Sequence, residues 1–324
     1  MSGLSVGLIG TGLMGRTHAQ GWQTRPGVLT CVYAPDERAR TFAREFNLRP
    51  CASTEELLDR VDIVDLCTPT PTHPDLAVQA ARAGRHVICE KPLALTLAEA
   101  DRIMAACRTA GVRLFVAHVL RFFPQYRAAW DQVQAGNIGI PRVLRLSRVS
   151  SPPAPGSWLL DEAQSGGVPL DLMIHDLDFA RWVAGEVNTV YAAGRHHGGR
   201  TMVQVTLSHI SGAISLIEGG WAAPAGVFRT ALDLAGTRGV IEWSSDAPAA
   251  LRRHGPQPEP RQLGAALPAL AGDPYAAELL HAYQAIEEGL PFLVEPEDAR
   301  AALALSHAVR RSLASGQAVG MEDA

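Results

Sequence analysis

Short apolar runs alternate with helix-like segments up to about residue 120. The apolar runs lie at residues 4–10, 29–34, 61–68, 85–90 and 112–118. They are continuous rather than alternating with polar residues, which indicates strands that are buried on both faces. Between them, residues 74–84 and 96–111 have helical spacing, and Thr96 and Glu99 form a capping-box pattern. Strands joined by helices in this way predict an α/β fold, a doubly wound parallel sheet over residues 1–120.

The pattern changes after residue 120. Residues 121–136 have the spacing of a helix, and strand-like stretches follow at 141–149, 188–196, 201–209, 212–221 and 229–243. Several of these are separated only by glycine-containing turns, which predicts a mostly antiparallel sheet. Two helical stretches, about 275–289 and 296–316, close the chain, and residues 254–274 have the composition of a loop. We therefore expect a second, α+β domain over residues 121–324.

Composition narrows the class of protein. A chain of 324 residues with 47% hydrophobic residues can bury a sizeable core, and its net charge of −4 does not attract nucleic acid or an anionic membrane. No apolar run reaches the roughly 18 residues of a membrane helix, and a strand starting at about Leu4 leaves no room for a signal peptide. The five cysteines form no Cys-x-x-Cys pair, so we expect free thiols in the cytoplasm and no zinc or other metal site.

A glycine-rich turn follows the first predicted strand and precedes a helix-compatible segment. In such a turn the first glycine permits a tight bend, the second lets the backbone approach a pyrophosphate, and the third lets the helix pack against the strand. The helix N-terminus then attracts the phosphate charge. We expect the turn to bind a dinucleotide through Gly10, Thr11, Gly12, Leu13, Met14 and Gly15.

The choice between NAD and NADP depends on the end of the second strand. An acidic residue there holds the ribose of NAD, whereas an Arg nearby accommodates the 2′-phosphate of NADP. This chain has Ala34 at the strand end, Asp36 as the nearest acid, and Arg38 and Arg40 shortly after. The alternative is that these charged residues only begin a solvated helix. The cofactor prediction is therefore NAD or NADP, with Asp36 and Arg38 as candidate contacts.

Two further segments end strands of the predicted parallel sheet. In open α/β sheets ligands bind outside the carboxyl ends of the strands. We therefore expect the cofactor to lie near Thr68, Pro69, Thr70, His73, Glu90 and Lys91. Alternatives stay open for two of them: His73 can satisfy the backbone at a helix start, and lysines are usually surface residues. Pro92 raises the chance of a cis Lys91–Pro92 bond, which would fix the direction of the lysine.

Asp171 and His175 lie in the segment 165–185, which has the composition of a helix ending at Gly185. Four residues apart on a helix, they would share one face. The pKa of histidine lies near physiological pH, which suits it to accept a proton from an alcohol. The alternative is a helix with a solvated acidic face and an incidental histidine.

Together these motifs resemble the glucose-fructose oxidoreductase / inositol dehydrogenase family, written Gfo/Idh/MocA. The resemblance runs over nearly the whole chain, from GLIGTGLMG through CEKPLALT and SGGVPLDLMIHDLDF to AALALSHAVRRSL. It implies a Rossmann domain, an open-faced sheet domain that binds substrate and forms homodimers or homotetramers, and an active site in the cleft between the domains. It also implies that Lys91, Asp171 and His175 are catalytic and that a sugar or polyol is the substrate.

Other positions are expected to modify the substrate site. Arg121 and Trp158 fall where the resemblance places the substrate, although core packing is an equal alternative for Trp158. Family members commonly have an acid at Ala34, glycines at Val168 and Met173, and a basic residue at Leu159. These departures argue against assuming a standard polyol such as inositol.

The sequence predicts an NAD(P)-dependent dehydrogenase or reductase acting on CH–OH groups. Two alternatives use the same fold: a non-catalytic regulator that senses a dinucleotide, and an enzyme that cleaves glycosides with transient use of NAD. The presence of Lys91, Asp171 and His175 argues against the first, and no basic patch indicates DNA contact.

Overall fold

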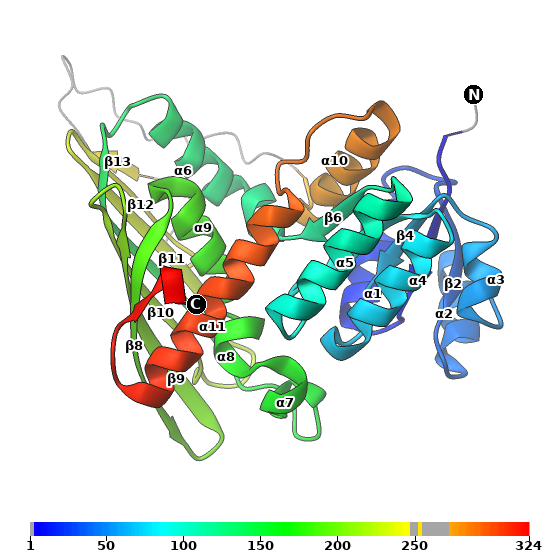
Figure 1. Cartoon of the computed structure of the whole chain (residues 1–324), viewed down its shortest axis with the longest axis horizontal. Coiled ribbons are helices and arrows are strands. Elements are labelled where there is room, and N and C mark those ends of the chain that lie inside the picture. The colour runs from blue at the N-terminus through cyan, green and yellow to red at the C-terminus, as the bar shows by residue number, and fades with distance from the viewer. Residues whose placement is uncertain (1–2, 247–251, 255–271, 324) are drawn as a thin grey trace. The chain divides into compact units, whose positions relative to one another are not determined.

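The computed structural model describes residues 3–246, 252–254 and 272–323 (Figure 1). Most of the predicted loop at 254–274 lies outside these residues. The chain forms two compact units, one of Met1–Phe122 with Gly272–Arg300 and the other of Phe123–Ala271 with Ala301–Ala324. Residues Gly272–Arg300 thus belong with the N-terminal unit, whereas the sequence pattern grouped them with the second domain.

The first unit contains a six-stranded sheet in the order β3-β2-β1-β4-β5-β6, and every pair of neighbouring strands is parallel. The predicted doubly wound α/β sheet is confirmed. Its strands are β1 (Val6–Ile9), β2 (Leu29–Tyr33), β3 (Arg49–Pro50), β4 (Ile63–Leu66), β5 (His86–Glu90) and β6 (Leu114–Ala117). The strand order reverses beside β1, so the carboxyl ends of β1 and β4 form the switch point at which such sheets bind ligands.

Helices connect and cover these strands. They are α1 (Leu13–Trp22), α2 (Arg38–Phe46), α3 (Thr54–Leu58), α4 (His73–Arg82), α5 (Leu97–Ala110) and α10 (Pro274–Glu288), with short 3₁₀ turns η1 (Thr70–Thr72) and η2 (Val119–Phe122). The predicted capping box is present at α5: Thr96 accepts the backbone N–H of Glu99, and Glu99 accepts that of Thr96. Helix α5 ends at Gly111, whose φ of 67° suits glycine.

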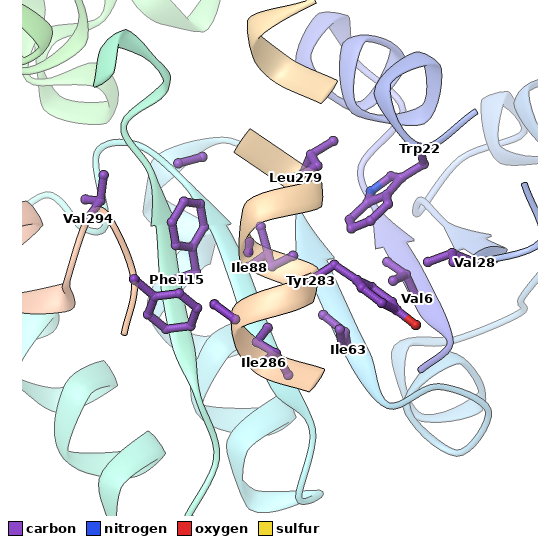
Figure 2. Close-up of a cluster of buried hydrophobic side chains, with 14 residues drawn as sticks. Val6, Trp22, Val28, Ile63, Ile88, Phe115, Leu279, Tyr283, Ile286 and Val294 are labelled. Carbon is purple, nitrogen blue, oxygen red and sulfur yellow. The ribbon is translucent and has the colours of Figure 1, made fainter. Parts of the chain in front are cut away.

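Apolar packing explains why α10 belongs to this unit. Its side chains Leu279, Tyr283 and Ile286 belong to one buried cluster with the sheet residues Val6, Ile63, Ile88 and Phe115 (Figure 2). Helix α10 also packs against α1, where Trp22 and Tyr283 meet edge to face with ring centroids 6.2 Å apart. Burial of this apolar stripe is the dominant favourable contribution to docking α10 on the sheet.

The second unit contains an eight-stranded sheet in the order β13-β12-β11-β7-β10-β9-β8-β14. Only the β7–β10 pair is parallel among the paired strands that the structure describes, so the predicted mostly antiparallel sheet is confirmed. The strands are β7 (Pro141–Ser150), β8 (Val187–His197), β9 (Arg200–His209), β10 (Ile214–Trp221), β11 (Phe228–Gly236), β12 (Val240–Ser244), β13 (Arg252–His254) and β14 (Val319–Gly320).

One face of this sheet carries helices. The helical elements are α6 (Pro124–Gln134), η3 (Trp158–Leu160), α7 (Glu162–Ser165), α8 (Gly167–Asp171), α9 (Ile174–Ala184), the C-terminal part of α11 (Pro296–Ser315) and η4 (Met321–Asp323). Helices α8 and α9 contact the central strands β7, β9 and β10. Along β10, buried Ser215 and Ile217 alternate with exposed Ile214 and Leu216, as expected of a sheet with one covered face.

None of the helices within the described ranges combines the length and apolar character needed to cross a membrane.

Candidate active site

The turn after β1 has the features of a pyrophosphate cradle. Gly10 has a φ of +110°, and a Cβ there would lie 2.5 Å from the carbonyl oxygen of Cys67, while a Cβ on Gly15 would collide with the carbonyl oxygen of Gly10. A Cβ on Gly12, in contrast, would meet no protein atom within 4 Å. Gly12 caps α1 without any side-chain hydrogen bond to the first helical N–H groups. The residues present therefore fit a bound phosphate, because the backbone is open where it would approach.

The other residues of the turn are accessible. Leu13 is 81% exposed at the start of α1, and Thr11 and Met14 are partly exposed.

The end of β2 lacks the expected acid. Ala34 is buried, and the nearest carboxylate, Asp36, accepts hydrogen bonds from the backbone N–H of Arg38 (3.0 Å) and from its Nε (2.8 Å). The hydrogen bond from the Arg38 side chain holds the pKa of Asp36 below its ordinary value. Arg38 is mostly exposed. Because it pairs with Asp36, its guanidinium offsets the charge of that carboxylate where the adenosine ribose is expected.

The segment after β4 is held by hydroxyl and imidazole contacts. Thr72 donates its hydroxyl to Pro69 O (2.8 Å) and lies 2.7 Å from the Thr68 hydroxyl, and Thr70 is buried. The buried ring of His73 places Nε2 2.9 Å from Thr68 O and Nδ1 3.0 Å from Pro92 O. Burial lowers the pKa of His73, although these carbonyls oppose the effect. His73 therefore links the ends of β4 and β5.

Lys91 follows β5 in a buried stretch. From residue 87 to residue 94 every residue is buried except Lys91, which is partly exposed. The Lys91–Pro92 peptide bond is cis. Glu90, expected to contact the cofactor, is itself buried, and its Oε2 accepts the backbone N–H of Lys91 at 3.0 Å.

Lys91 is also the one lysine in the sequence. Of the 29 Lys and Arg residues, 28 are therefore arginine. The chain uses arginine at every other position of permanent positive charge, so a primary amine is specific to position 91. This signal was available in the sequence, and a motif-based analysis overlooks it.

Asp171 and His175 show the same pattern of exposure. Between residues 165 and 180 every residue is buried except these two, which are partly exposed. The expectation of one continuous helix was wrong: α8 ends at Asp171 and α9 begins at Ile174, with a turn between them. Pro169 lies within α8 and the αL residue Gly166 precedes it, which limits α8 to a short element.

A buried ion pair fixes α9 next to His175. Arg148 on β7 donates to Asp176 through Nε (2.6 Å) and Nη2 (3.1 Å), and its Nη2 lies 3.4 Å from the hydroxyl of Tyr126. Burial raises the pKa of Asp176, although Arg148 opposes this effect. The bidentate pair holds the start of α9, and with it His175, against the sheet.

The remaining predicted residues differ in their placement. Arg121 is buried and donates through Nη1 to Leu293 O (2.8 Å) and to Asp298 (3.1 Å), which ties η2 to the segment after α10. We therefore leave it out of the substrate site. Trp158 begins η3 and is partly exposed, and its substrate contact stays a prediction.

Two of the residues that depart from the family pattern have side chains that point away from solvent. Val168 and Met173 are buried, and Met173 packs over Gly219 on β10, where a Cβ would collide with it. The expectation that these two residues alter the substrate pocket directly therefore finds no support in their side-chain positions.

The sequence motifs did not predict a buried cluster of charged residues next to Lys91. His18 on α1 places Nδ1 2.9 Å from Asp65 and Nε2 3.0 Å from Glu90, and Trp22 donates its Nε1–H to Asp65 at 2.8 Å. The signal that could have revealed it is Asp65, a charged residue in the middle of an apolar strand.

His18, Asp65 and Cys67 also have potential metal-ligand atoms within 4.8 Å of one another. Burial raises the pKa of the Cys67 thiol, so that a thiolate ligand is disfavoured. Both ring nitrogens of His18 already face carboxylates. With both ring nitrogens of His18 occupied and a thiolate disfavoured, the cluster gives no support to a metal site.

Comparison with known proteins identifies the family. A family model described as an oxidoreductase family with an NAD-binding Rossmann fold matches residues 4–118, and a model of the GFO/IDH/MocA C-terminal domain matches residues 126–242. The chain belongs to the GFO/IDH/MocA oxidoreductase family. It is an oxidoreductase with a nicotinamide dinucleotide, NAD or NADP, as its cofactor.

Individual relatives match along the whole length or a large part of it. Myo-inositol 2-dehydrogenase of Thermotoga maritima is 30% identical, with 99% of each chain covered. The 1,5-anhydro-D-fructose reductase of Ensifer adhaerens is 36% identical over 60% of each chain. The crystal structure of GenD2 from gentamicin A biosynthesis, in complex with NAD, is 26% identical with a TM-score of 0.85, covering 99% of this chain and 97% of that chain.

Proposed function

We propose that this protein transfers a hydride between NAD(P) and the hydroxyl-bearing carbon of a sugar, polyol or related small molecule, with Lys91, Asp171 and His175 as catalytic residues. The observation that carries the proposal is their exposure. Each is partly accessible within a run of otherwise buried residues, on rigid elements that begin or end beside it. A buried framework with one accessible functional group is the arrangement that catalysis requires.

The three side chains divide the chemistry. A nicotinamide dinucleotide held at the Gly10–Gly15 turn would supply the hydride acceptor or donor. The imidazole of His175 takes the hydroxyl proton in the oxidative direction and returns it in the reductive one. The Asp171 carboxylate accepts a hydrogen bond that orients this hydroxyl, and the Nζ of Lys91 donates a hydrogen bond to the oxygen where charge changes.

The relatives support a polyol or sugar substrate. The matched proteins are named for myo-inositol and for 1,5-anhydro-D-fructose, one a dehydrogenase and the other a reductase. We propose that this chain acts on a compound of the same chemical class, with Trp158 as a candidate contact.

Cofactor choice follows from the end of β2. We propose that this chain accepts NADP as well as NAD, because Ala34 offers the ribose no carboxylate and Arg38 offsets the charge of Asp36.

We also propose a homodimer or homotetramer in a reducing cytoplasm. All five cysteines are free and buried, as suits a compartment in which disulfides do not form. Ile214, Leu216 and Tyr191 are exposed apolar residues on the sheet of the second unit. A second copy of the chain is the occupant we propose for that face.

The test uses the wild type and His175→Asn with two probes, myo-inositol with NAD or NADP and 1,5-anhydro-D-fructose with the reduced cofactors. We expect the wild type to turn over at least one probe and His175→Asn to be slower by about 100-fold or more in kcat. The result against the proposal is a wild type that binds neither reduced cofactor in a fluorescence titration, or a His175→Asn variant as active as the wild type.

A further inference from the structure

Two buried histidines hold the two residues that flank Lys91. On one side, Glu90 has its Oε1 3.0 Å from Nε2 of His18. On the other side, the carbonyl oxygen of Pro92 lies 3.0 Å from Nδ1 of His73. His18 is fully buried and His73 is 1% exposed, and they come from different helices, α1 and α4.

The contact with Glu90 reaches the backbone of Lys91. One carboxylate oxygen of Glu90 faces His18, and the other accepts the N–H of Lys91 at 3.0 Å. Glu90 is 6% exposed, so no bulk water replaces either partner. If the imidazole contact is lost, Glu90 is left as a buried carboxylate without its ionic partner, and its hold on the Lys91 amide loosens.

The charged groups around His18 determine the protonation of its ring. Its Nδ1 faces Asp65 on β4 and its Nε2 faces Glu90 on β5, while Cys67 and Glu278 of α10 are the other titratable groups near it. Burial alone would lower the pKa of His18, but the charge of Asp65 and the hydrogen bond to it hold this pKa well above its ordinary value. A doubly protonated ring can donate to both carboxylates at once, which a neutral ring cannot.

Net stability does not account for such a cluster. A buried ion pair pays for much of its attraction in lost hydration, and apolar side chains of similar volume often stabilise a core equally well. What the cluster provides is geometry, because each hydrogen bond favours a narrow range of lengths and directions.

We propose that His18 and His73 are positioning residues for Lys91, acting through Glu90 and the Pro92 carbonyl respectively, so that its amine approaches substrate from one preset direction. This inference rests on the proposed catalytic role of Lys91. It assigns to the two histidines a part in the reaction although neither reaches substrate.

Substitutions by asparagine and by glutamine test the two ring nitrogens of each histidine separately. The amide nitrogen of Asn can stand in for Nδ1 of histidine, and that of Gln for Nε2, so each keeps one of the two hydrogen bonds. At position 18 the link toward Lys91 runs through Nε2, so His18→Gln keeps it and His18→Asn loses it. At position 73 the link is the donation from Nδ1–H to the Pro92 carbonyl, with the one proton of the neutral ring on Nδ1, so His73→Asn keeps it and His73→Gln loses it.

The expected result is a crossover. His18→Asn and His73→Gln should lower kcat by about 100-fold, as for a misplaced catalytic group. His18→Gln and His73→Asn should stay within about tenfold of the wild type. For each variant kcat is measured at a cofactor concentration that fluorescence titration with NADH shows to be saturating, so that a change in cofactor affinity does not enter the comparison. Activity is followed with whichever of myo-inositol and 1,5-anhydro-D-fructose the wild type turns over.

A second readout needs no substrate. Because Lys91 is the one lysine, reductive methylation with ¹³C-formaldehyde labels it and the N-terminal amine alone. In NMR spectra the Lys91 methyl signal should stay at the wild-type position in His18→Gln and His73→Asn. It should move toward that of a solvated lysine in His18→Asn and His73→Gln.

Equal effects of Asn and Gln at both positions, in kcat and in the methyl signal, would overturn the positioning role and leave the histidines as core residues. If one pair of variants does not fold, the pair at the other histidine decides. A Lys91→Met enzyme with wild-type turnover would instead remove the proposed function itself. The two failures are therefore distinguishable.

Discussion

At the scale of single residues, the chain has positive charge at many positions but a side-chain primary amine only at Lys91. Its position is set by Glu90 and Pro92, and its partial exposure is unique within residues 87–94. Arginine supplies charge at the other 28 positions. Guanidinium is always protonated and planar, whereas an amine can exchange a proton and donate in three directions. The role proposed for Lys91 needs an amine rather than a guanidinium.

Cofactor selectivity is also decided by single residues. Arg38→Ala should weaken NADPH binding by about tenfold and change NADH binding by less than about twofold, because only NADPH carries the 2′-phosphate that a guanidinium would bind. Fluorescence titration of both cofactors measures this. Arg44→Ala, on the exposed side of α2, is the matched control. Equal weakening of NADH and NADPH by Arg38→Ala would refute the assignment.

The sequence predicts individual residues unevenly. Gly10, Gly12 and Gly15 were predictable because backbone geometry dictates them, and the structure gives each the expected surroundings. Arg121 was less predictable, since its buried contact with Asp298 joins residues 177 positions apart. The contacts of His18 with Asp65 and Glu90 likewise join residues 47 and 72 positions apart, and no local pattern encodes such distances.

At the scale of elements, local signals predicted most strands of both sheets and α5, whereas tertiary packing determines where α10 is placed. Apolar runs and a capping box are local, so β1 and α5 appear where the pattern placed them. The break between α8 and α9 has only a weak local signal in Gly166 and Pro169. The placement of α10 with the first unit depends on its apolar stripe meeting strands that lie far earlier in the chain, which no local pattern reports.

Helix α10 carries a buried acidic group that gives a stability prediction. Glu278 is fully buried, and neither carboxylate oxygen has a hydrogen-bond partner among the described residues. Burial, reinforced by the charge of Glu90, raises the pKa of Glu278 well above its ordinary value. The folded state therefore binds this proton more tightly than the unfolded state, so stability falls as pH rises from the ordinary range of glutamate through the raised pKa.

Glu278→Met should remove this loss of stability at higher pH. The free energy of unfolding should exceed that of the wild type by about 1–3 kcal/mol near pH 8, and by much less near pH 4, because an apolar chain of similar shape replaces a carboxyl without partners. Urea unfolding at both pH values measures it. Glu288→Met, at an exposed glutamate on the same helix, should show no such pH-dependent gain. A Glu278→Met protein that is less stable than the wild type at both pH values would contradict this prediction.

At the scale of the whole molecule, the sheet of the second unit leads to a prediction about assembly. Ile214 and Leu216 alternate with buried residues along β10, so both point to the sheet face opposite α8 and α9. A shallow cavity of about 500 Å³ lies on this unit and includes Leu216, Glu218 and Arg145 in its lining. Exposed apolar residues that gather on one face, rimmed by polar and charged residues, mark an interaction surface.

Leu216→Arg should therefore shift the protein toward monomers, since it buries an unpaired charge at the contact. Sedimentation velocity over a range of protein concentrations measures the change. Ile210→Arg is the matched control, because Ile210 is an exposed apolar residue in the β9–β10 turn and not on the sheet face. A wild type that is monomeric at all concentrations would contradict the proposed assembly.

The central claim is that the amine of Lys91 acts in hydride transfer. The most direct measurement compares the wild type with Lys91→Met and Lys91→Arg, following reduced nicotinamide during turnover and cofactor binding by fluorescence in the same samples. We expect both variants to bind NADH within about twofold of the wild type and to lose about 1,000-fold or more in kcat. Turnover by Lys91→Met at the wild-type rate would contradict it.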